Sequence, residues 1–152
     1  MEVINKTLEE QLIEKERELD ELRKKIEANK PKPITERVKG YLDVLDILKV
    51  DESKDKIEIY GFDEAENKVV KTFIKKMRIT KVYREGWIPK RGERRYYPYF
   101  DVSSGFAFYY TDYGGTGADT ASASRLCLPN EETTRDYASK FIDVERDLID
   151  LP

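Results

Sequence analysis

Side chains that could neutralise phosphates and stack on bases are concentrated between residues 68 and 100. Residues 68–95 contain eleven Lys and Arg but only two acids. Lys and Arg displace counterions from a nucleic-acid backbone, and aromatic rings stack on unpaired bases. The tract therefore supplies a candidate nucleic-acid-binding set, which is Lys75, Lys76, Arg78, Lys81, Trp87, Lys90, Arg91, Arg94, Arg95 and Tyr96.

The same tract has a simpler interpretation, in which its charges solvate a helix and its aromatic rings build a core. The isoelectric point is about 5.3, which is low for a nucleic-acid-binding domain. Both ends of the chain are acidic, with nine acids against six bases in residues 1–29 and seven against three in residues 129–152. These segments offer the basic tract a protein partner, so both interpretations stay open.

The residue types on which most enzymes depend are scarce. The chain has no His and one Cys, Cys127, which removes Ser-His-Asp and Cys-His arrangements and the usual zinc sites. The glycine-rich run 113–117 lacks the Lys and the following helix of a phosphate-binding loop. Cys127 lies between Leu126 and Leu128, where a small buried hydrophobe is expected. We therefore expect a non-enzymatic protein with no cofactor and no metal site.

Residues 1–29 are predicted to form one helix that associates with a second copy. They are rich in Glu, Lys, Leu and Arg and contain neither Gly nor Pro, which favours a helix. Apolar residues recur at the a and d positions of a heptad repeat, the pattern of a coiled coil, although Asn5 and Lys15 interrupt it. The alternative is a helix packed on its own domain. The predicted oligomerisation residues are Leu8, Leu12, Leu19, Leu22 and Ile26.

Pro31 and Pro33 end this helix and divide the chain into an oligomerisation helix, 1–30, and an α+β domain, 31–152. Within the domain we expect helices over 35–48 and 64–85, a last helix from Asn130, and a short strand over 56–62. The aromatic-rich segment predicts a hairpin, with Pro98 favouring an edge strand or a bulge. A mobile loop over 112–124 precedes a third strand. The three strands, 94–101, 105–111 and 124–128, should form an antiparallel sheet packed by helices.

Several short motifs, in order, resemble one group of proteins. They are Tyr-Tyr-Pro-Tyr-Phe at 96–100, Ser-Ser-Gly-Phe-Ala-Phe at 103–108 and Ser-Arg-Leu-Cys-Leu at 124–128. Together they resemble a family of small proteins encoded by phages and prophages of Bacteroides-like bacteria, over residues 31–149. Tyr99, Ala107 and Leu128 depart from that pattern but remain apolar or aromatic. The resemblance implies a phage origin and supplies no catalytic residues.

The N-terminal segment becomes densely charged too early for a signal peptide or a membrane span. The sequence thus predicts a cytoplasmic protein of a bacterial host that can be incorporated in a virion. Its expected partners are a second copy, bound through helix 1–29, and other phage or host proteins. No membrane contact is expected, and nucleic acid is the alternative partner.

Overall fold

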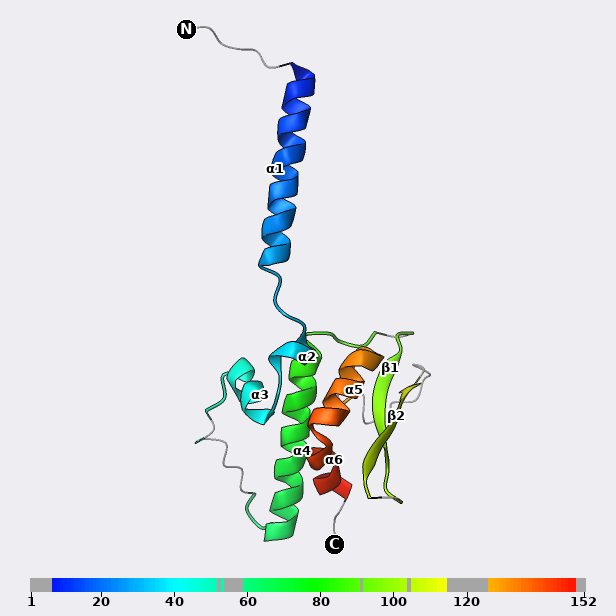
Figure 1. Cartoon of the computed structure of the whole chain (residues 1–152). Coiled ribbons are helices and arrows are strands. Elements are labelled where there is room, and N and C mark those ends of the chain that lie inside the picture. Colours follow the sequence, from blue (N-terminus) through cyan, green and yellow to red (C-terminus); the bar gives the residue numbers. More distant parts are fainter. Residues whose placement is uncertain are drawn as a thin grey trace. The chain divides into compact units, whose positions relative to one another are not determined.

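A computed structural model of the chain describes residues 7–51, 53, 59–90, 92–103, 105–114 and 126–149 (Figure 1). As the sequence predicts, the chain combines helices and a sheet. It divides into two compact units, residues 1–32 and residues 33–152. The first contains one helix, and the second contains the hydrophobic core and the sheet.

Helix α1, Leu8–Ala28, is the whole regular structure of the first unit among the described residues. Thr7 caps its start, because the Thr7 hydroxyl accepts from the Glu10 N–H and the Glu10 carboxylate accepts from the Thr7 N–H. This reciprocal cap satisfies two backbone donors that a helix start leaves free. Every residue of α1 is exposed. The helix predicted over 1–29 thus begins at residue 8, and residues 1–6 lie outside the described part.

The helix predicted over 35–48 is two helices, α2, Ile34–Arg37, and α3, Tyr41–Leu48. The break lies at Val38 and Gly40, whose backbones are extended. The Asp43 carboxylate accepts hydrogen bonds from the N–H groups of Lys39 and Gly40, so it caps the second helix. Those hydrogen bonds lower the pKa of Asp43.

Helix α4, Glu64–Tyr83, confirms the helix predicted over 64–85. Asp63 and Glu66 form a second reciprocal cap at its start. At its other end Glu85 and Gly86 have φ of 46° and 83°, a left-handed turn that ends many helices and suits glycine. The strand predicted over 56–62 is wrong for residues 59–62, which form the turn into α4; residues 56–58 lie outside the described part.

The sheet has two antiparallel strands, β1, Arg95–Asp101, and β2, Ala107–Gly114. Pro98 pairs with Thr111, and the register shifts one residue later, between Tyr99 and Phe100. A bulge near Pro98 is the expected accommodation of a residue without an N–H. Residues 112–114 belong to β2, so the predicted loop over 112–124 is wrong there; its remainder lies outside the described part.

The predicted third strand over 124–128 is, where the structure describes it, a single antiparallel bridge between Leu128 and Tyr96. Their backbone N–H and C=O groups exchange hydrogen bonds of 3.0 and 3.1 Å. A three-stranded sheet is therefore not seen among the described residues, and residues 124 and 125 lie outside them.

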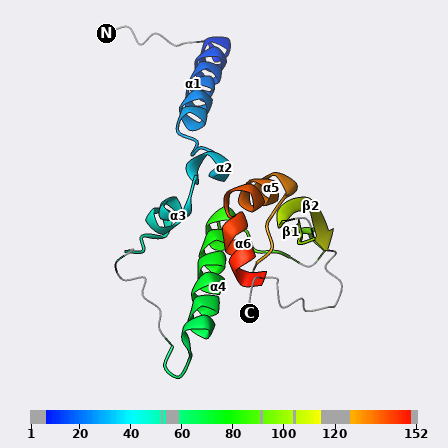
Figure 2. The same ribbon diagram turned by 60° about the horizontal axis from the view of Figure 1, so that its bottom comes forward.

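The helix predicted from Asn130 onward is also divided into two helices. They are α5, Glu131–Lys140, and α6, Ile142–Ile149. The break is at Phe141, which has non-helical angles and buries its ring in the core. Helix α5 packs against both strands, and α6 packs against α4. Both views show α5 between α4 and the hairpin (Figures 1 and 2). The core between these elements contains Val38, Val44, Ile79, Leu128, Tyr137, Ala138 and Val144.

Candidate functional site

The apolar seam of α1, defined as Leu8, Leu12, Leu19, Leu22 and Ile26, is the first candidate interaction surface. These side chains lie one or two turns apart and are 49% to 84% exposed. No residue of α1 is buried within its own unit. Five large aliphatic side chains in a row on one helix face are the pattern of an interaction seam.

Charged residues of α1 pair along the helix itself. Lys15 Nζ lies 2.7 Å from Glu18 Oε2, and this contact raises the pKa of Lys15. Similar i,i+3 and i,i+4 pairs join Arg17 to Glu21, Asp20 to Arg23 and Glu27 to Lys30. Such exposed pairs each support a helix by a few tenths of a kcal/mol, roughly. They keep α1 helical while the seam remains uncovered.

The basic residues of α4 bind partners inside the domain. Lys75 Nζ lies 4.8 Å from the centre of the Tyr41 ring, and Arg78 Nη1 donates to Tyr41 Oη at 3.1 Å. Lys76 Nζ lies 2.7 Å from Glu145 Oε2 on α6. These three side chains therefore face two different neighbours, α3 and α6, and do not form one surface.

The other predicted nucleic-acid residues are spread more widely. Lys81 and Trp87 line a groove, Lys90 and Arg94 are exposed, and Arg91 lies outside the described residues. The last two, Arg95 and Tyr96, are partly buried on β1. The structure thus brings together Lys81 and Trp87 but not the predicted set as a whole.

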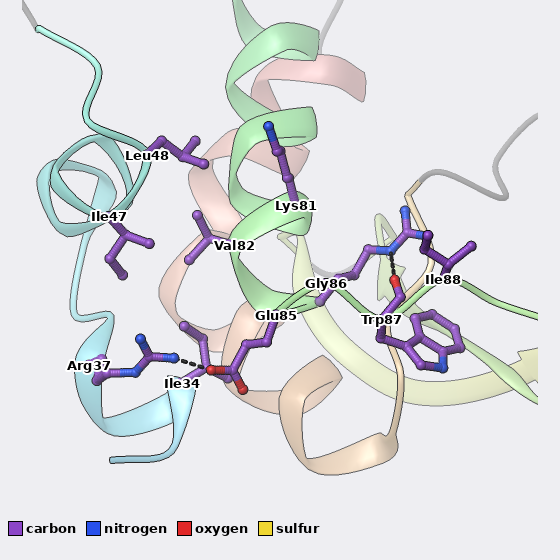
Figure 3. A pocket seen from close by; sticks show the side chains of 11 residues that line it. Ile34, Arg37, Ile47, Leu48, Lys81, Val82, Glu85, Gly86, Trp87 and Ile88 are labelled. Atoms are coloured by element: carbon purple, nitrogen blue, oxygen red, sulfur yellow. Dashed lines mark hydrogen bonds and ion pairs between the residues drawn. The ribbon is translucent and has the colours of Figure 1, made fainter. Parts of the chain in front are cut away.

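The groove, our second candidate surface, has a volume of about 500 Å³ and lies between α2, α3 and the end of α4. Figure 3 shows Ile47 and Leu48 on one side and Trp87 and Ile88 on the other. Ile34 and Val82 are its buried residues, whereas Ile88 is 75% exposed. The groove is therefore mainly apolar, with an exposed rim.

The left-handed turn at Glu85 and Gly86 builds one wall of the groove. It reverses the chain after α4, and the Trp87 N–H donates to the Arg84 carbonyl at 2.7 Å. In return Arg84 Nε donates to the Trp87 carbonyl at 3.2 Å (Figure 3). Arg37 on α2 forms an ion pair with Glu85 across the groove. The groove could not be predicted from the sequence, because its residues come from three segments; the one available signal was Ile88, an apolar residue beside Pro89.

Two carboxylates hold the helices of the domain together. Asp136 accepts from Tyr83 Oη at 2.6 Å and binds Lys140 Nζ at 2.8 Å. Lys140 Nζ also donates to the carbonyls of Thr35 and Val38, at 2.6 and 2.7 Å. The ammonium group thus satisfies carbonyls at the end of α2 that would otherwise lack partners.

The second carboxylate, Glu145, is 5% exposed. It accepts a hydrogen bond from Tyr137 Oη and pairs with Lys76. Burial and the neighbouring carboxylates raise the pKa of Tyr137, and of Tyr83 beside Asp136. A raised pKa keeps the phenol protonated, which is opposite to what a tyrosine base needs. Burial likewise raises the pKa of Cys127, which disfavours a nucleophilic thiolate.

These tyrosines give a test at high pH. In unfolded chains tyrosine titrates near pH 10, whereas folded Tyr83 and Tyr137 retain their protons above it. The folded state then binds more protons, so the contribution of these two tyrosines to the free energy of unfolding should be constant with pH below 10 and fall above it. Spectrophotometric titration should show at least two of the ten tyrosines ionising only as the domain unfolds. The Tyr83→Phe variant should show one fewer; normal titration of all ten would contradict this assignment.

Within the described residues, no group of three or more Cys, Asp or Glu is placed to hold a metal ion. Nor does any helix of this described part have the length and apolar character needed to cross a membrane. Comparison with known proteins finds no matching family model, curated protein or solved structure.

Proposed function

We propose that this chain is a non-enzymatic protein that self-associates through α1 and uses the domain 33–152 as a binding module in a larger assembly. The observation that carries the proposal is the seam of α1, which is apolar, regularly spaced and exposed along its length. The phage origin implied by the sequence motifs suggests a virion component or a host-interaction factor as the setting.

The seam is suited to a partner helix. Burying a Leu or Ile side chain stabilises a complex by about 1.5 to 3 kcal/mol. Burial of five such residues from each copy offsets the cost of bringing two chains together, which is about 4 to 15 kcal/mol. Most of the stability of a helix in a protein comes from packing its apolar face rather than from helix propensity. Pairing would therefore stabilise the helix as well as join the copies.

The groove is the surface that the domain would present. It combines an apolar floor with exposed Ile88 and the cation Lys81. An apolar surface with a few polar groups at its edge is typical of sites that receive a side chain or a short segment of another protein.

Sedimentation of the full chain over a range of concentrations tests the self-association. We expect a species of at least two copies, and a monomer after deletion of residues 1–30. The deletion variant should keep the near-ultraviolet signal of the folded domain, because its core lies in residues 33–152. A full-length monomer at all concentrations would contradict the proposal.

Nucleic-acid binding remains the alternative, and the groove gives it one specific observation. Lys81, Arg84 and Trp87 line the same groove, and cations beside an aromatic ring suit a phosphate and a base. This function requires salt-sensitive binding of single-stranded DNA or RNA that weakens in a Lys81→Ala, Trp87→Ala variant. No change in anisotropy of a labelled oligonucleotide at low salt would rule it out.

A further inference from the structure

We propose that two copies of α1 pair antiparallel, so that the C-terminal ends of the two helices lie at opposite ends of the pair. This inference rests on the proposed self-association and adds the orientation of the second copy. Two independent properties of α1 support it, namely the residues that meet across the seam and the distribution of charge along the helix.

The seam matches itself best when the second copy is reversed. An antiparallel pair centred on Arg17 places Leu8 opposite Ile26 and Leu12 opposite Leu22, since a positions then face d positions. Lys15, the polar residue of the seam, faces Leu19 of the second copy. A parallel pair in register instead places Lys15 opposite Lys15, where like charges meet between the helices.

The flanking charges favour the same orientation. Residues 7–18 contain five acids and two bases, whereas residues 19–30 contain three acids and four bases. The first half therefore has a net charge of −3 and the second half of +1. A reversed second copy sets each acidic half beside a basic half, whereas a parallel copy sets like beside like.

Individual e and g positions balance between the two orientations, so the seam and the charge of the two halves carry the choice. In the antiparallel pair Glu9 lies beside Arg23 of the second copy, twice by symmetry. A parallel pair keeps the favourable contact of Glu18 with Arg23, also twice by symmetry, but brings Lys25 close to Lys30 twice. At the centre of the antiparallel pair Glu16 and Glu18 each approach their own copy, and Lys15, 2.7 Å from Glu18, offsets part of that repulsion. The opposed dipoles of two antiparallel helices add a small favourable energy.

Spin labels at two exposed positions distinguish the orientations in the full-length protein. Ala28 is eleven residues from the centre, so two labels there are separated along the axis by about 33 Å at 1.5 Å per residue in an antiparallel pair. In a parallel pair only the width of two helices, roughly 20 Å, separates them. Labels at Arg17, on the outer face at the centre, lie within that width in both orientations and report pairing alone.

We expect Arg17→Cys labels to give a short distance and Ala28→Cys labels to give a distance above 30 Å by pulsed electron resonance. Cys127 is fully buried, and labelling of the unaltered chain measures its background. A short distance at both positions would overturn the antiparallel arrangement while leaving self-association intact. An absence of coupling at both positions would overturn self-association itself.

Discussion

Replacing Leu12 by Glu is expected to abolish the proposed self-association at micromolar concentration. Leu12 occupies an a position of the seam and is 60% exposed in the single chain. The change removes about 1.5 to 3 kcal/mol of burial from each copy and places a charge between the helices. We therefore expect the dissociation constant, measured by analytical ultracentrifugation, to rise at least about a hundredfold.

The neighbouring residue provides a matched control. Ile13 is also apolar and 65% exposed, but it occupies a b position outside the seam. Ile13→Glu introduces the same charge into the same helix turn and should change the dissociation constant by less than about threefold, as for an exposed helix substitution. Equal weakening by both variants would show that helix stability, rather than the seam, controls association.

Replacing Lys76 by Met is expected to produce a large loss of stability in the domain. Lys76 is the cationic partner of Glu145, and their side chains are 18% and 6% exposed. Removing one member of a buried pair leaves the other charge without compensation, at a cost of about 3 kcal/mol. Denaturant unfolding followed by circular dichroism should show this loss in the free energy of unfolding.

The partner substitution should restore part of that loss. In the double variant Lys76→Met, Glu145→Gln, the buried charge is absent and the amide oxygen can still accept from Tyr137, so roughly 1 kcal/mol or more should return. Lys68→Met is the control. Lys68 also pairs with α6, at Asp147, but over 3.8 Å and with both side chains more than half exposed. Such a pair contributes little, and a loss comparable with that of Lys76→Met would refute the role of burial.

Local sequence signals located the long elements well. The helix over 64–85 was predictable because its apolar residues recur every fourth position, although Ile79, Val82 and Tyr83 would also suit a strand. The hairpin was predictable from its aromatic density and Pro98. The two shorter helical regions were predicted without their breaks. Gly40 and Phe141 cause those breaks, and the position of Phe141 depends on a core that no local window contains.

The two candidate surfaces also differ in how far local sequence predicts them. The seam could be read from the sequence, because the residues that form it belong to one helix. The groove could not, because Ile34, Leu48 and Trp87 meet only after the chain has folded. The basic tract shows the opposite error. A run of Lys and Arg looks like one surface in sequence, but Lys75 and Lys76 are one residue apart and face Tyr41 and Glu145, on different helices.

The ammonium group of Lys140 has a consequence for synthesis of the protein. It binds the carbonyl groups of Thr35 and Val38, more than a hundred residues earlier in the chain. On the ribosome, the first helices of the domain must therefore wait for α5 before they can be fixed in place. The cap of α1 and its ion pairs join residues close in sequence, so they can form without that delay. Neighbouring nascent chains could thus associate through α1 before either domain has folded.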